Sequence, residues 1–138
     1  MGVHASDLAV RRHERYLCDL AARIAVEGPE VRLARAALGA HGHLAARLVD
    51  VSRGGMSLST GVYLPPSCLV SITVALPGER TLVTRARVHR SAMTDRRPSY
   101  YIGAAYEGED AARDAAVEEF IRALREAGAE PVPEPRRA

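Results

Sequence analysis

Two groups of residues in this sequence have the chemistry to bind a flat, charged ligand. The first is "RRHER", in which Arg11 and Arg15 stand four positions apart. A guanidinium group is planar, donates paired hydrogen bonds to phosphate oxygens or to O6 and N7 of guanine, and stacks on a base. We therefore expect this cluster to be an arm that binds phosphate or guanine. A solvated charged surface is the alternative interpretation.

The second group is "DVSRGG", residues 50–55, which we call the corner. Asp50 can accept hydrogen bonds from the N–H groups of a guanine, and the Ser52 hydroxyl can donate or accept. In an extended chain, side chains two positions apart point to the same face. Gly55 offers positive-φ freedom and lets a ligand approach the backbone. Taken alone, the corner is better explained as a turn between two strands.

Signatures of catalysis and of metal binding are missing from the sequence. It holds no GxSxG nucleophile elbow, no phosphate-binding P-loop and no GxGxxG. His41 and His43 could chelate a metal but have no nearby cysteine or carboxylate to complete a site. We therefore expect a protein that is not an enzyme and that holds no metal or cofactor.

Composition indicates one soluble globular domain. The chain has 138 residues, of which 47% are hydrophobic and 26% charged, enough for a real core. With one Phe, five Tyr and no Trp, that core must consist of Val, Leu, Ile and Ala. The net charge of +2 is weak evidence for nucleic-acid binding, so we expect no DNA partner.

The cysteines and the apolar runs indicate the compartment. Cys18 and Cys68 are interpreted as buried thiols of a reducing cytosol rather than as a disulfide. The N-terminus has no secretory h-region, and no apolar run approaches the ~20 residues of a membrane span. We expect a cytoplasmic protein without membrane insertion.

Alternation of apolar and polar residues predicts β-structure through most of the chain. The stretch 16–28 fits both a strand and a helix, and 28–43 fits both a short helix and a long connection. From residue 111 the apolar period becomes 3.6, which predicts a helix over 111–126, with Asp110 as N-cap and Gly128 at C′. Short strands closed by one helix predict a small antiparallel barrel. The other expected strands are 44–51, 54–60, 69–76, 81–90 and 100–108.

Together the two polar groups resemble the paired signature of the PilZ domain, RxxxR followed by [D/N]xSxxG. Further along, "LPGE" before a basic alternating strand resembles the family's middle hairpin. Gly103 with Tyr106 is similar to the Gly-x-x-Phe of its last strand, and the terminal helix also matches. The resemblance covers residues 11–126.

The resemblance implies an all-β fold, a six-stranded antiparallel β-barrel with a C-terminal α-helix, that binds the bacterial second messenger cyclic di-GMP. Arg11 and Arg15 would hold phosphates and guanines. Asp50 and Ser52 would contact a guanine, and Gly55 would keep the site open. An apolar residue before the first arginine favours a single bound ligand. Secondary candidate positions are Val10, Arg12, Arg53, Gly54 and Gly103.

The implied mechanism is recognition without chemistry. In a single-domain receptor the arginine arm would order on the ligand and signal to an unidentified protein effector, in a process such as motility or biofilm formation. One alternative is a PilZ-like interaction module of motility or pilus function that binds no nucleotide. Another is an oligonucleotide-binding barrel, for which the aromatic residues are too few. The expected parts are a flexible N-terminus (1–10), the domain (11–126) and a Pro-rich tail (127–138). Within the domain we expect the arginine arm (11–15), an extended connection (28–43) and the helix (111–126). The end of the tail, residues 131–138, should be extended and solvated.

Overall fold

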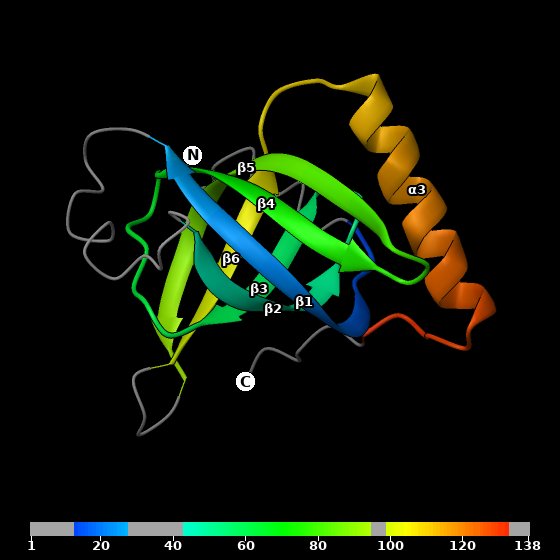
Figure 1. Cartoon of the computed structure of the whole chain (residues 1–138), viewed down its shortest axis with the longest axis horizontal. Coiled ribbons are helices and arrows are strands. Elements are labelled where there is room, and N and C mark those ends of the chain that lie inside the picture. The colour runs from blue at the N-terminus through cyan, green and yellow to red at the C-terminus, as the bar shows by residue number, and fades with distance from the viewer. Residues whose placement is uncertain (1–12, 28–42, 95–98, 133–138) are drawn as a thin grey trace.

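A computed structural model describes residues 13–27, 43–94 and 99–132. Six antiparallel strands form a closed barrel in the order β1-β2-β3-β6-β5-β4, and one helix lies against it (Figure 1). The predicted fold class is thereby confirmed. The elements are β1 (Tyr16–Glu27), β2 (Leu44–Val51), β3 (Gly55–Thr60), β4 (Leu69–Leu76), β5 (Arg80–Met93), β6 (Tyr100–Tyr106) and α3 (Ala111–Glu126).

In the stretch 16–28, which fitted both a strand and a helix, Tyr16–Glu27 form strand β1. It pairs with β2 on one side and with β4 on the other, which closes the barrel. Ala22 and Ile24 are buried and the intervening Arg23 is exposed, as period-two alternation requires. Pairing with two neighbouring strands satisfies the backbone N–H and C=O groups of this long strand. Tertiary structure therefore decides between the strand and helix periodicities.

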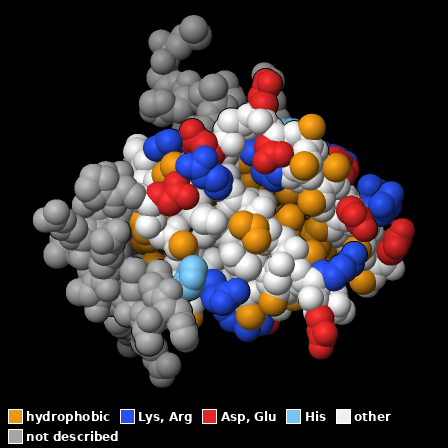
Figure 2. Space-filling model, turned by 45° about the horizontal axis from the view of Figure 1, so that its top comes forward, with side chains coloured by type: hydrophobic (Ala, Val, Ile, Leu, Met, Phe, Trp, Pro, Cys, Tyr) orange, Lys and Arg blue, Asp and Glu red, His pale blue; other side chains and the backbone are white. Residues whose placement is uncertain are grey.

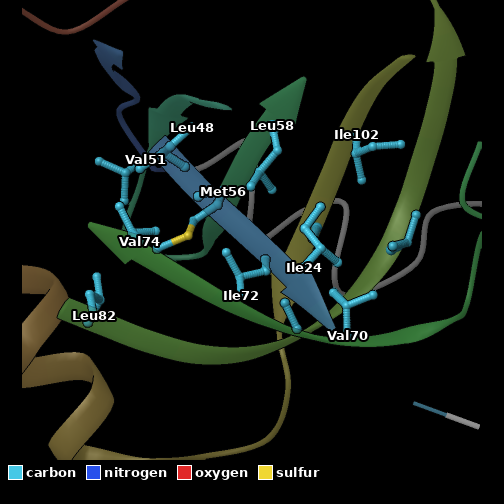
Figure 3. Close-up of a cluster of buried hydrophobic side chains, with 14 of the residues drawn as sticks. Ile24, Leu48, Val51, Met56, Leu58, Val70, Ile72, Val74, Leu82 and Ile102 are labelled. Atoms are coloured by element: carbon cyan, nitrogen blue, oxygen red, sulfur yellow. The ribbon is translucent and has the colours of Figure 1, made fainter. Parts of the chain in front are cut away.

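The barrel interior is aliphatic, as the composition predicts. Large side chains from all six strands meet inside it and are fully buried (Figure 3). Burying one Leu or Ile side chain contributes about 1.5–3 kcal/mol. The labelled side chains that show this most clearly are Ile24, Leu48, Leu58, Ile72 and Ile102.

Helix α3 begins and ends with the two predicted caps. The Asp110 carboxylate accepts a hydrogen bond from the Arg113 N–H at 3.0 Å. At the other end Gly128 has φ +99, and its N–H donates to the Arg125 carbonyl at 3.0 Å. The left-handed glycine ends the helix in a Schellman-type cap. The buried face that packs on the barrel consists of Val117, Phe120 and Ile121.

Replacing Asp110 by alanine is expected to lower the free energy of unfolding by about 1 kcal/mol, because the N-cap acceptor is lost. Urea denaturation would measure the change. Glu109→Ala is the matched control, since Glu109 is an exposed acidic neighbour outside the cap. Equal effects of the two substitutions would contradict a specific capping role.

After the helix, the chain turns back to the start of the barrel. Pro131 bridges to Tyr16, and the Val132 N–H donates to the Arg15 carbonyl at 2.7 Å (Figure 1). Pro131 is exposed and Val132 half-buried, so the first residues of the tail run along the start of β1 while remaining at the surface. Their pairing partners are the end of the predicted arginine arm and the first residue of β1. Residues 133–138 lie outside the described part of the chain.

No disulfide joins the two cysteines, of which Cys68 is buried and Cys18 half-buried. Burial raises the pKa of Cys18 to about 12, and the negative charges of Asp50 and Asp19 add to the effect. The Cys18 thiol is therefore protonated and unreactive near neutral pH. Within the described residues, no helix has the length and apolar character that crossing a membrane requires.

Candidate ligand-binding site

Ser52 organises the corner through its own hydrogen bonds. Its Oγ accepts from the N–H groups of Gly54 and Gly55, both at 3.1 Å, and its backbone N–H donates to the Gly55 carbonyl at 2.9 Å. The Tyr106 hydroxyl donates to the Ser52 carbonyl at 3.0 Å. These hydrogen bonds stabilise the turn, and Ser52 itself is only 2% exposed. This role agrees with the interpretation of the corner as a turn between two strands.

Gly55 is required by the approach of a neighbouring strand. A Cβ atom at this position would lie 2.1 Å from the Ala104 carbonyl oxygen of β6. The expectation of a positive φ at Gly55 is wrong, since the described glycines with positive φ are Gly78, Gly108 and Gly128. In this structure the backbone that approaches Gly55 closely is that of β6.

Asp50 is the point where the arm, β2 and β6 meet. Its carboxylate accepts a hydrogen bond from the Tyr101 hydroxyl at 3.1 Å, and Arg15 Nη1 lies 3.9 Å from its Oδ2. Burial raises the pKa of Tyr101, and its phenol is therefore a neutral donor. The Arg15 side chain remains 30% exposed, whereas that of Asp50 is only 6% exposed. The structure thus brings together two candidate residues from separate motifs.

The remaining members of the corner serve other contacts. Arg53 forms an ion pair with Glu118 of α3, which lowers the pKa of that carboxyl. The Gly54 carbonyl accepts the Tyr106 N–H at 3.1 Å. Since the Arg53 pair is exposed, it contributes little to stability, but it joins the corner to the helix.

Of the other predicted positions, the structure describes Gly103 but not the three at the N-terminus. Gly103 lies on β6 and pairs with Ser57, which in turn pairs with Asp50. Val10, Arg11 and Arg12 lie outside the described residues. Tyr101 was missed as a site residue, although it lies two positions from Gly103 and so on the same face of the strand.

The charged side chains on one face of the molecule bear on the kind of ligand that this face could bind. On the face in Figure 2, basic and acidic side chains of the described residues are interspersed rather than gathered in one stripe. A groove for single-stranded nucleic acid needs continuous basic character with aromatic platforms. Within the described residues, no three His, Cys, Asp or Glu side chains form a metal site. The cluster around Asp50 offers a carboxylate acceptor, a phenol and a guanidinium, which suit recognition.

Comparison with protein families adds an independent finding. The family model described as the PilZ domain matches residues 9–123 of this chain. A search of curated proteins found no match.

Comparison with solved structures finds the same barrel in several proteins. The inhibitor of motility MotI (DgrA) of Bacillus subtilis is 16% identical, with a TM-score of 0.61 over 86% of this chain and 52% of that protein. The PilZ domain of YcgR from Escherichia coli with c-di-GMP is 16% identical, with a TM-score of 0.59 over 85% of this chain and 93% of that domain. The complex of MrkH from K. pneumonia with c-di-GMP is 16% identical, with a TM-score of 0.63 over 85% of this chain and 53% of that protein. This chain therefore spans about half the length of MotI and MrkH, and these likenesses establish a shared fold.

Proposed function

The chain belongs to the PilZ domain family, and from this premise we propose that it is a receptor for cyclic di-GMP. PilZ domains are generally non-catalytic receptors. Two of the similar solved structures, those of YcgR and MrkH, contain c-di-GMP. The observation that carries the proposal is the approach of Arg15 to Asp50 at the barrel surface.

The two side chains would have complementary tasks. The Asp50 carboxylate would accept hydrogen bonds from the N–H groups of a guanine, with Tyr101 holding it in place. Arg15 would bind a phosphate or a second edge of the ligand through its paired donors. Because 3.9 Å is longer than a hydrogen bond, a phosphate could recruit Arg15 without displacing a hydrogen bond to Asp50.

The other candidate residues would act around this pair. Arg11, with Arg12 beside it, would add charge from the arm, which would order on the ligand. Ser52 and Gly55 would support the site by fixing the corner that ends β2. An apolar Val10 favours a single ligand. The signal would pass to a protein effector in the cytoplasm, in a process such as motility or biofilm formation.

Isothermal titration of the unaltered chain with cyclic di-GMP tests the proposal. We expect saturable binding of one ligand. Cyclic di-AMP has the same backbone but lacks the guanine N–H groups that Asp50 would recognise, and we expect no comparable binding. Equal affinity for both dinucleotides would contradict guanine recognition by Asp50. Absence of binding to either would favour the alternative of an interaction module that binds no nucleotide.

A further inference from the structure

The outer face of the barrel beside Asp50 continues as a row of residues across four strands. Asp50 of β2 pairs with Ser57 of β3, which pairs in turn with Gly103 of β6. On its other side Gly103 pairs with Arg90 of β5. Directly paired residues point to the same face of a sheet. With strands about 4.8 Å apart, the row is about 14 Å long. Asp50 and Ser57 are only 4% and 7% exposed and Gly103 is buried, whereas Arg90 at the far end is exposed.

The place above Gly103 is filled by the imidazole of His89. A Cβ atom on Gly103 would lie 3.0 Å from both Cε1 and Nε2 of His89. The pairing of β5 with β6 shifts between Val88 and Arg90, and His89 is the residue within this irregularity. Bulges of this kind re-aim a side chain and are over-represented beside functional sites. His89 as a residue is half-buried, in contrast to the buried Gly103 beneath it.

The row therefore combines three kinds of recognition chemistry. A carboxylate stands at one end and a guanidinium at the other, and an aromatic ring lies over a residue without a side chain between them. Nucleobases stack on aromatic rings, and an imidazole N–H can donate to a purine nitrogen, a carbonyl or a phosphate. We propose that His89 is a further ligand contact whose ring stacks on a guanine of cyclic di-GMP, with Gly103 providing its clearance. This inference rests on the proposed function.

A purely structural role for His89 makes different predictions. A ring packed on a strand glycine can stabilise a sheet without any ligand. In that case His89→Ala would change the unfolding temperature but not the affinity. A ligand contact would change the affinity in a protein that remains folded.

Titration calorimetry with cyclic di-GMP distinguishes the two roles. We expect His89→Ala to weaken binding roughly tenfold or more, because one base–aromatic stack is lost. His89→Phe should keep most of the affinity because it retains a ring. Gly103→Ala should also weaken binding by displacing the imidazole, and should have no further effect in the His89→Ala background. His43→Ala, an exposed histidine beside the other end of β2, is the matched control and should bind normally.

Each outcome decides a separate point, provided that thermal unfolding shows every variant to be folded. Unchanged affinity of His89→Ala, with binding by the unaltered protein, overturns the contact and leaves the proposed function standing. Additive effects of His89→Ala and Gly103→Ala would show that the glycine acts independently of the ring, which overturns the stacked arrangement. Absence of binding by the unaltered protein overturns both proposals.

Discussion

Gly55→Ala is expected to lower the free energy of unfolding by about 3 kcal/mol or more. The new methyl group would lie 2.1 Å from the Ala104 carbonyl oxygen, so the backbones of β3 and β6 would have to separate. Gly55 pairs with Ala105, and this separation would weaken the ladder where the corner joins the barrel. Chemical denaturation followed by circular dichroism would measure the change.

Gly103→Ala is the matched control for this substitution. It also adds one methyl group to a glycine in a paired strand, but the atoms it would meet belong to the far end of the His89 side chain. A side chain can move where a backbone carbonyl cannot, so we expect a cost below about 1 kcal/mol. If Gly55→Ala were no more destabilising than Gly103→Ala, the close packing of β3 against β6 would be ruled out as the reason for Gly55.

The second large effect is expected on ligand affinity. Arg15→Ala and Asp50→Ala should each weaken cyclic di-GMP binding at least about tenfold, since charge-assisted hydrogen bonds contribute about 1.5–3 kcal/mol. Both variants should remain folded because neither side chain belongs to the apolar core. Calorimetric titration would measure the affinity, and thermal unfolding would verify the fold.

Arg47→Ala separates a specific role from a general loss of positive charge. Arg47 lies on β2 three positions before Asp50, but its exposed guanidinium pairs with Asp19 at 2.6 Å. We expect this variant to bind normally. Unchanged affinity in both Arg15→Ala and Asp50→Ala would contradict the assignment of the site. Equal weakening by Arg47→Ala would indicate a non-specific electrostatic effect.

The barrel and its helix were predictable because their signals are local and repeated. Val70, Ile72 and Val74 alternate with polar residues along β4, and the two caps of α3 are single residues with strong positional preferences. The stretch of β1 was ambiguous because its small and aliphatic residues satisfy both periods. Only its pairing with two distant strands makes it a strand.

For the candidate site, the sequence pointed to Arg15 and Asp50 but not to the contacts that they make. Arg15 and Asp50 stand out by type and order, and the fold brings them together. The hydrogen bond from Tyr101 to Asp50 depends on strand register. The ion pair of Arg53 with Glu118 depends on where the helix packs. Those depend on contacts between residues far apart in the chain, which no spacing within one motif reveals.

The corner also bears on how such motifs should be used to classify sequences. The serine and the second glycine of Asp50-x-Ser52-x-x-Gly55 are explained here by turn hydrogen bonds and by strand packing, without a ligand. A relative that does not bind the proposed ligand would have no need of the aspartate and the arginines, but the same turn and strand packing would still favour the serine and the glycine. We therefore expect Ser52 and Gly55 to follow the fold, and Arg15 and Asp50 to follow the ligand.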